Sequence, residues 1–109
     1  MKKTIIAIFG LTLLTSLINA EDKAIRKHIE SLGEKMIKAS LESDYEAILS
    51  YHTEDVIVMP NFQPMIRGKQ ALRDNYDENL KRGSKIHSLS GTTSDFWICG
   101  DMVFRIGTF

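Results

Sequence analysis

The sequence has almost no cysteine, because Cys99 is the only one among its 109 residues. A single cysteine cannot form an internal disulfide, so the chain is not a small secreted domain held together by a disulfide framework. Free cysteine is among the most buried residue types, and we therefore expect Cys99 to be a small buried side chain. The alternatives are a reactive thiol or a bridge to another chain, but no histidine or lysine nearby in sequence would activate a thiolate.

The sequence also lacks an excess of positive charge. It contains 14 lysines and arginines against 14 acidic residues, so its formal net charge is zero. Proteins that bind duplex nucleic acid usually present a basic stripe that neutralises phosphates. No such stripe is found, and nucleic acid is not expected as a partner. No repeat, low-complexity tract or linker divides the chain, whose length suits one domain.

A long hydrophobic run occurs only once, at the start of the chain. The segment MKKTIIAIFGLTLLTSLINA has two lysines, then an apolar run over residues 5–18, and ends on the small residue Ala20. This is the layout of a secretory signal peptide, and the run is shorter than the ~20 apolar residues of a spanning helix. We expect residues 1–20 to be a cleaved bacterial export signal and residues 21–109 to form a secreted or periplasmic domain without membrane contact. The alternative is an anchor that stays attached.

Two helices are predicted after this segment. The first spans residues 22–41, where apolar residues recur at helical spacing on one face. These residues are Ile25, Ile29, Leu32 and Met36. A short helix follows, and the spacing of Ser43 and Glu46 is that of a capping box. Its buried side is expected to consist of Tyr45, Ile48 and Leu49.

The middle of the chain predicts two short strands and a third helix. The segment DVIVMP reads as a strand that ends at Pro60, and MIRG reads as a brief second strand. Gly68 then opens a helix over residues 69–82, and Gly83 is placed to end it in a left-handed conformation. The apolar stripe of this helix is Ala71, Leu72, Tyr76 and Leu80, with Ala71 allowing close approach to a sheet.

The last part of the chain predicts a β-hairpin. Residues 84–99 read as extended chain with a bulge at Gly91, and Gly100-Asp101 fits a two-residue turn. This turn sets the pairs Cys99–Met102, Ile98–Val103 and Trp97–Phe104. One face would then carry Trp97, Cys99, Met102, Phe104 and Ile106, and the other Phe96, Ile98, Val103, Arg105 and Phe109. Both faces are largely apolar, so we expect the hairpin to be covered on both sides.

The order of these elements predicts an α+β fold in which three helices, mainly toward the N-terminus, pack on one face of a curved antiparallel sheet. Three segments also carry a family resemblance: YHTEDVIVMP, RGKQALRDNY and the GD hairpin of WICGDMVFRIGTF. In this order and spacing they resemble SnoaL-like and nuclear-transport-factor-2-like domains, the cone-shaped fold that includes the ketosteroid isomerases. The resemblance covers most of residues 25–109.

What the resemblance implies is an incomplete cone. Family members continue with two further long strands after this hairpin, so the resemblance implies either a domain shortened at its C-terminus or a last strand that pairs with another molecule. The general base of the ketosteroid isomerases is an aspartate near the end of the first strand, where Val58 or Met59 stands here. The acid–base carboxylate of the cyclases would fall beyond Phe109. The resemblance therefore assigns no catalytic residue to this chain.

Four residues are predicted to bind a ligand: Met59, His87, Trp97 and Phe104. Met59 would shape a plastic apolar pocket, His87 would line the cavity from a strand, and Trp97 would offer an indole N–H. Phe104 lies opposite Trp97 in the predicted register. Each of these side chains also suits ordinary packing or the surface. The three histidines lack the spacing of metal ligands, and no metal or cofactor is expected.

Three functions remain open at this point. The favoured one is an exported domain that holds a small apolar molecule in the cone without chemistry, because the family's base is missing and the hairpin is apolar. The alternative is an isomerase, cyclase or hydratase whose acid–base residue lies in the missing strands. The third is a structural homodimer that forms through the sheet. Whether the chain is an enzyme stays open.

Overall fold

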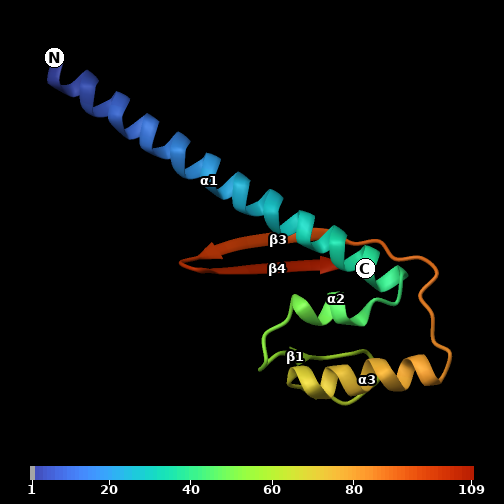
Figure 1. The fold of residues 1–109 in the computed structure, drawn as a ribbon. Helices are drawn as coiled ribbons and strands as arrows, with labels where there is room; N and C mark the ends of the chain where they lie inside the picture. The colour runs from blue at the N-terminus through green and yellow to red at the C-terminus, as the bar shows by residue number, and fades with distance from the viewer. Residues whose placement is uncertain (1) are drawn as a thin grey trace. The chain divides into compact units, whose positions relative to one another are not determined.

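The computed structural model describes the backbone of residues 2–109 and the side chains of residues 20–109. Its elements, drawn in Figure 1, are α1 (Lys2–Leu41), α2 (Tyr45–Ser50), β1 (Ile57–Val58), β2 (Ile66–Arg67), α3 (Lys69–Lys81), β3 (Thr92–Cys99) and β4 (Met102–Thr108). The α+β class is therefore as predicted. The expected signal peptide falls, up to residue 19, outside the described side chains. In the part of the chain that was described, no helix is long and apolar enough to cross a membrane.

The chain divides into two compact units. The first joins α1 up to Leu32 with residues 92–108, which form the β3–β4 hairpin, and the second contains residues 33–91. Among the described side chains, every buried hydrophobic residue belongs to the second unit: Ala39, Ile48, Leu49 and Leu72. The small core of the protein therefore lies in the second unit.

The start of α2 differs from the prediction. Its N-cap is Asp44, whose Oδ1 accepts a hydrogen bond of 3.1 Å from the backbone N–H of Ala47. The predicted capping box of Ser43 and Glu46 is wrong, because Ser43 has a left-handed backbone with φ 56° and serves as the turn between the helices. The Glu46 carboxylate instead pairs with Arg73 of α3 at 2.9 Å.

Helix α3 packs against α2 in the second unit. Leu72 is buried, and the rings of Tyr45 and Tyr76 stack at a centroid distance of 4.5 Å and an interplanar angle of 6°. Gly68 (φ 86°) and Gly83 (φ 74°) stand before and after the helix, as predicted. Ala71 is exposed, so its predicted role against a sheet is wrong. The short ribbon of this unit has two residues in each strand, and β2 contacts the helix.

The strands form two separate sheets where the sequence predicted a single curved one. Strands β1 and β2 pair antiparallel, with Ile57 opposite Arg67, and β3 pairs only with β4. The predicted extended strand over residues 84–99 is regular only from Thr92 onward. Because residues 84–91 form no ladder, they do not join the two ribbons into one sheet.

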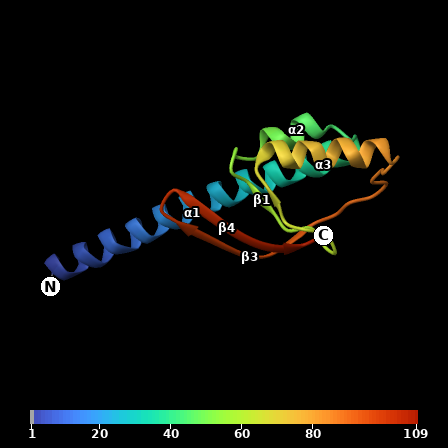
Figure 2. The ribbon, with the colours of Figure 1, turned by 90° about the horizontal axis from the view of Figure 1, so that it is seen from below.

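The β3–β4 hairpin has the predicted register, which pairs Cys99 with Met102, Ile98 with Val103, and Trp97 with Phe104. Figure 2 shows the two strands side by side in a second view. The bulge predicted at Gly91 is wrong, because Gly91 precedes the first paired residue. The irregularity lies at Ser94, between Thr93 and Asp95. There the Ser94 hydroxyl donates a 3.2 Å hydrogen bond to the Ile106 carbonyl.

Candidate functional site

The two faces of the hairpin differ in exposure, because successive strand residues point to opposite sides. The inner face consists of Phe96, Ile98 and Val103, which are half-buried, and of the exposed Arg105. The outer face consists of Trp97, Cys99, Met102, Phe104 and Ile106, with Asp95 at the end away from the turn. Its large side chains are 48% (Trp97), 56% (Met102), 49% (Phe104) and 55% (Ile106) exposed. The predicted division into two apolar faces is therefore confirmed, but only the inner face is partly covered.

Two residues of this region are not placed as predicted. Cys99 is exposed rather than buried, because it lies beside the turn on the uncovered outer face. Phe109, which was expected on the inner face, lies beyond the end of β4 and is almost fully exposed. The burial of each side chain thus depends on what covers the hairpin, which the alternation pattern does not specify.

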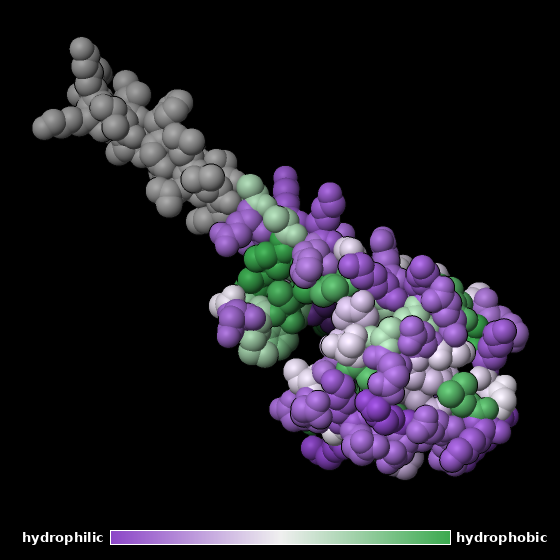
Figure 3. Space-filling model, in the orientation of Figure 1, coloured by the Kyte–Doolittle hydropathy of each residue, from purple (hydrophilic) through white to green (hydrophobic). Residues whose placement is uncertain are grey.

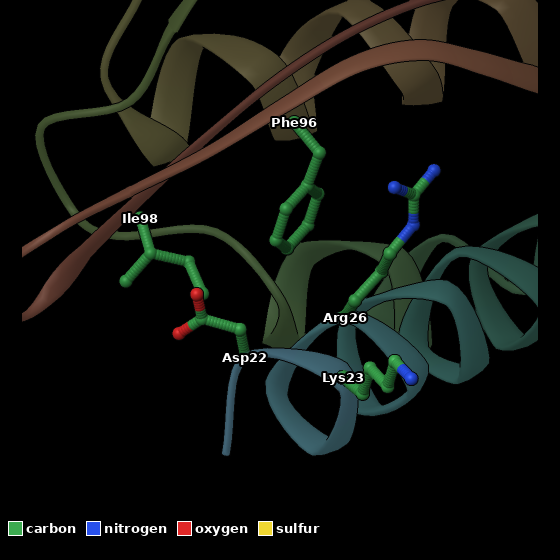
Figure 4. Close-up of a pocket in the computed structure, with 5 residues that line it drawn as sticks. All are labelled: Asp22, Lys23, Arg26, Phe96 and Ile98. Carbon is green, nitrogen blue, oxygen red and sulfur yellow. The ribbon is translucent and has the colours of Figure 1, made fainter. Parts of the chain in front are cut away.

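A cleft of about 320 Å³ separates the inner face from α1 within the first unit. Figure 4 shows Phe96 and Ile98 pointing from β3 toward the helix, which contributes Asp22, Lys23 and Arg26. The guanidinium of Arg26 lies 5.5 Å from the centre of the Phe96 ring, in range for a cation–π contact. Its Nε also donates a 3.0 Å hydrogen bond to Glu30. All three charged side chains lining the cleft are exposed, so the cleft is open to water.

The outer face has a nearly continuous apolar composition. Figure 3 shows hydrophobic residues gathered over the hairpin, whereas polar residues cover most of the rest of the visible surface. Within β3 and β4, the one charged residue on this side is Asp95, opposite Ile106 and far from the turn. Arg105 belongs to the other side, opposite Phe96. The outer face can therefore make apolar contacts without burying a charge.

The structure brings together two of the four predicted ligand-binding residues. Trp97 and Phe104 lie opposite each other on the outer face. Met59 is 75% exposed after β1, and His87 is exposed in the irregular segment before β3; both belong to the second unit. Met102 and Ile106 share the outer face with the aromatic pair. The alternation of residues along the strand predicts Met102 and Ile106 on that face. This pattern was enough to include both in the predicted site.

Polar groups suited to chemistry are not gathered at the outer face. Among the described side chains no polar or charged one is buried, and no three His, Cys, Asp or Glu residues are placed to hold a metal ion. His52 stands at the end of α2, as predicted, with its Nδ1 2.8 Å from the Ile48 carbonyl oxygen. In the second unit, burial and the neighbouring Tyr45 raise the pKa of Tyr76. Both groups lie in the second unit and not on the outer face of the hairpin.

Comparison with known proteins does not assign the chain to a family. No protein-family model matches it, and no curated protein is a significant match. What supports a function is therefore the composition, exposure and register of the outer face.

Proposed function

We propose that this chain is a small-molecule-binding domain of the SnoaL-like and nuclear-transport-factor-2-like kind, and that the outer face of the hairpin is a wall against which a small apolar ligand lies. The observation that carries the proposal is the row of four large apolar side chains, each about half exposed, held in register by β3 and β4. The α+β order of elements is consistent with part of a cone-shaped fold. The layout of residues 1–20 supports export to a secreted or periplasmic location.

The exposed aromatic pair offers enough surface for weak binding. An aromatic side chain presents about 150–250 Å², so the exposed halves of Trp97 and Phe104 together offer roughly 200 Å². Covering this area is favourable by about 5 kcal/mol before the cost of immobilising the ligand is subtracted. The Trp97 indole N–H adds one hydrogen-bond donor, and the flexible Met102 adapts to different shapes. The expected ligand is apolar, with at most one acceptor for this donor.

The composition of the wall favours binding over catalysis. A proton-transfer enzyme needs an acid or base within hydrogen-bond reach of its substrate. The single charged residue on this side, Asp95, is exposed at the end of the face away from the turn. The position that the family resemblance assigns to a general base holds Val58 or Met59, which cannot accept a proton. The ligand is therefore expected to leave unchanged.

The proposal is tested with N-phenyl-1-naphthylamine, a neutral apolar dye that fluoresces in apolar surroundings. Trp97 is the only tryptophan, so energy transfer from it reports dye that binds near the hairpin. We expect saturable energy transfer in the full chain, with a dissociation constant on the order of 1 mM. Phe104→Ser should weaken this binding about tenfold, the equivalent of about 1.4 kcal/mol.

The matched control is Phe62→Ser. Phe62 is also an exposed phenylalanine, but it lies in the second unit and outside the hairpin. Its replacement should leave the energy transfer unchanged. The proposal fails if the full chain gives no saturable energy transfer, or if Phe62→Ser weakens the binding as much as Phe104→Ser does.

A further inference from the structure

The charged residues of the hairpin are divided between its two sides. The β3–β4 hairpin contains three of them: Asp95, Asp101 and Arg105. Arg105 stands opposite Phe96 on the inner face, whereas Asp95 stands opposite Ile106 on the outer face. Asp101 belongs to the turn between the strands. Strands β3 and β4 therefore present one charge on the outer face, and that charge is negative.

The carboxylate of Asp95 is accessible to a ligand. Asp95 is exposed, and none of the ion pairs among the described side chains includes it. Arg105 is the next charged residue along the ladder, but it points to the inner side, because successive strand residues alternate. The positive side chains of α1 that approach the hairpin, Lys23 and Arg26, line the cleft on the inner side. These cations therefore leave the negative charge of the outer face without a partner.

The same carboxylate lies next to the aromatic pair. Asp95 precedes Trp97 by two residues on the same face, and the pairs from Asp95–Ile106 to Trp97–Phe104 follow each other without interruption. Two residues of a strand span about 6.6–6.8 Å. A group bound at Asp95 would therefore stand about 7 Å from a ring that lies against Trp97 and Phe104. One small molecule can reach both.

We infer that Asp95 makes the outer face selective for amphipathic cations, in which an apolar ring system is joined to one ammonium group about 7 Å away. The inference rests on the proposed binding function and names the chemical class of its ligand. The ring covers Trp97 and Phe104, and the ammonium group pairs with the carboxylate. Asp95 is exposed, so the cation keeps most of its water and avoids the desolvation penalty of a buried ion pair. An anion of the same shape is repelled from this position.

The charge decides the choice of ligand more than its affinity. Ion pairs between exposed groups are weak, and each changes a binding constant by no more than about fivefold. The apolar ring therefore supplies most of the binding. Salt separates the two contributions, because the Debye length falls from about 8 Å at physiological ionic strength to about 3 Å at 1 M. High salt should remove the preference for a cation and retain the contact of the ring.

Two dyes of opposite charge test the preference in the full chain. Dansylethylenediamine and dansyl-β-alanine have the same fluorescent ring system and the same two-carbon chain, which ends in an ammonium group in the first and in a carboxylate in the second. Energy transfer from Trp97 reports the binding of either dye near the hairpin. We expect the cationic dye to bind about fivefold more tightly at physiological salt, and the two dyes to bind about equally at roughly 1 M sodium chloride.

Two matched variants locate the charge that is responsible. Asp95→Asn removes the charge with almost no change in size, so its dissociation constants for the two dyes should be about equal. The control is Asp101→Asn, which changes the net charge by the same amount within the same hairpin. Asp101 lies in the turn, roughly 10 Å from the aromatic pair and thus beyond the Debye length of about 8 Å. This variant should keep the roughly fivefold preference for the cationic dye.

The outcomes separate the inference from the proposed function. Equal binding of the two charged dyes to the unmodified chain would overturn the inference. A preference that is retained in Asp95→Asn, or lost equally in Asp101→Asn, would also overturn it. Any of these results together with binding of the neutral N-phenyl-1-naphthylamine would leave the proposed ligand wall in place. If neither the charged dyes nor the neutral dye binds, both the inference and the proposed function fail.

Discussion

The two units of the chain handle their apolar residues in opposite ways. The second unit buries Leu49 and Leu72 almost completely, with 1% and 2% of their surfaces exposed. The first unit leaves Trp97 and Phe104 about half exposed on the outer face of its hairpin. The second unit is thus already stabilised by the burial of its leucines. In the first unit, Trp97 and Phe104 can still gain hydrophobic free energy when they are covered. The helices of the second unit therefore carry stability, and the hairpin retains surface for association.

The difference has a simple origin in the secondary structure. In the second unit, α2 and α3 turn their apolar residues toward each other, and a few large side chains fill the contact. In the first unit both faces of the hairpin are apolar, but only the side facing α1 is partly covered. An isolated two-stranded hairpin is at best marginally stable in water. Covering the outer face of the first unit is therefore expected to gain the most hydrophobic free energy.

The largest effect is expected in the core of the second unit. Leu49→Ala removes a buried side chain and should destabilise the fold by about 2–5 kcal/mol. Urea unfolding followed by helical circular dichroism measures this loss. Leu80→Ala is the control, because Leu80 is 46% exposed and its truncation should cost less than about 1 kcal/mol. Equal losses for the two variants would show that stability is not concentrated in the buried residues.

A smaller effect is expected in the hairpin. A Cβ on Gly107 would lie 2.4 Å from the Thr92 carbonyl oxygen, so Gly107→Ala forces the strands apart at the end away from the turn. We expect a cost of about 1–3 kcal/mol, seen as a change in Trp97 fluorescence at a lower urea concentration. The helical signal of the second unit should be retained.

Thr108→Ala is the control for this variant. Thr108 is exposed and pairs with Thr92, and alanine keeps the Cβ that threonine already has. If Gly107→Ala lowers both signals together, the two units unfold as one, and the contrast drawn between them does not hold for stability.

The smallest effect concerns Tyr76. Its pKa lies above the usual 10.0, because burial and the neighbouring Tyr45 disfavour the charged phenolate in the folded state. The unfolded chain therefore releases this proton at lower pH than the folded one. The contribution of Tyr76 to stability is present below pH 10.0 and is lost as the pH rises through the folded pKa.

Urea titrations at alkaline pH measure this effect. Tyr76→Phe keeps a ring for the stack with Tyr45 but removes the proton, so its stability should fall less steeply above pH 10.0 than that of the unmodified chain. Parallel losses in the two chains would assign the pH dependence to other groups and leave the tyrosine pair with a packing role only.

Local signals were sufficient where one residue type decides the geometry. Gly100-Asp101 set the hairpin turn, and the alternation that follows from it placed Trp97 opposite Phe104. Gly68 and Gly83 marked the ends of α3 for the same reason. At the start of α2 the local signal was ambiguous, because Ser43 and Asp44 are both good capping residues. Because Ser43 has a left-handed backbone in the turn, Asp44 is the residue that caps α2.

Sequence patterns failed to predict pairing and burial where these depend on contacts between distant parts of the chain. Residues 84–91 carry Ile86 and Leu89 among polar residues, but no strand pairs with them, and two sheets formed in place of the predicted single one. Cys99 was expected to be buried because its residue type usually is, yet its side chain is exposed. The grouping of Met59 and His87 with Trp97 stays a prediction, because Met59 and His87 belong to the second unit and Trp97 to the first.

The extra residue at Ser94 also decides which side chains lie at the open end of the hairpin. From the turn as far as Asp95, each residue of β3 stands opposite one residue of β4 without interruption. Ser94 adds one residue to β3, so Thr93 stands opposite Gly107 and not opposite Thr108. A one-residue shift moves every following side chain of a strand to its other face. Thr93 is therefore half-buried on the same side as Phe96 and Ile98.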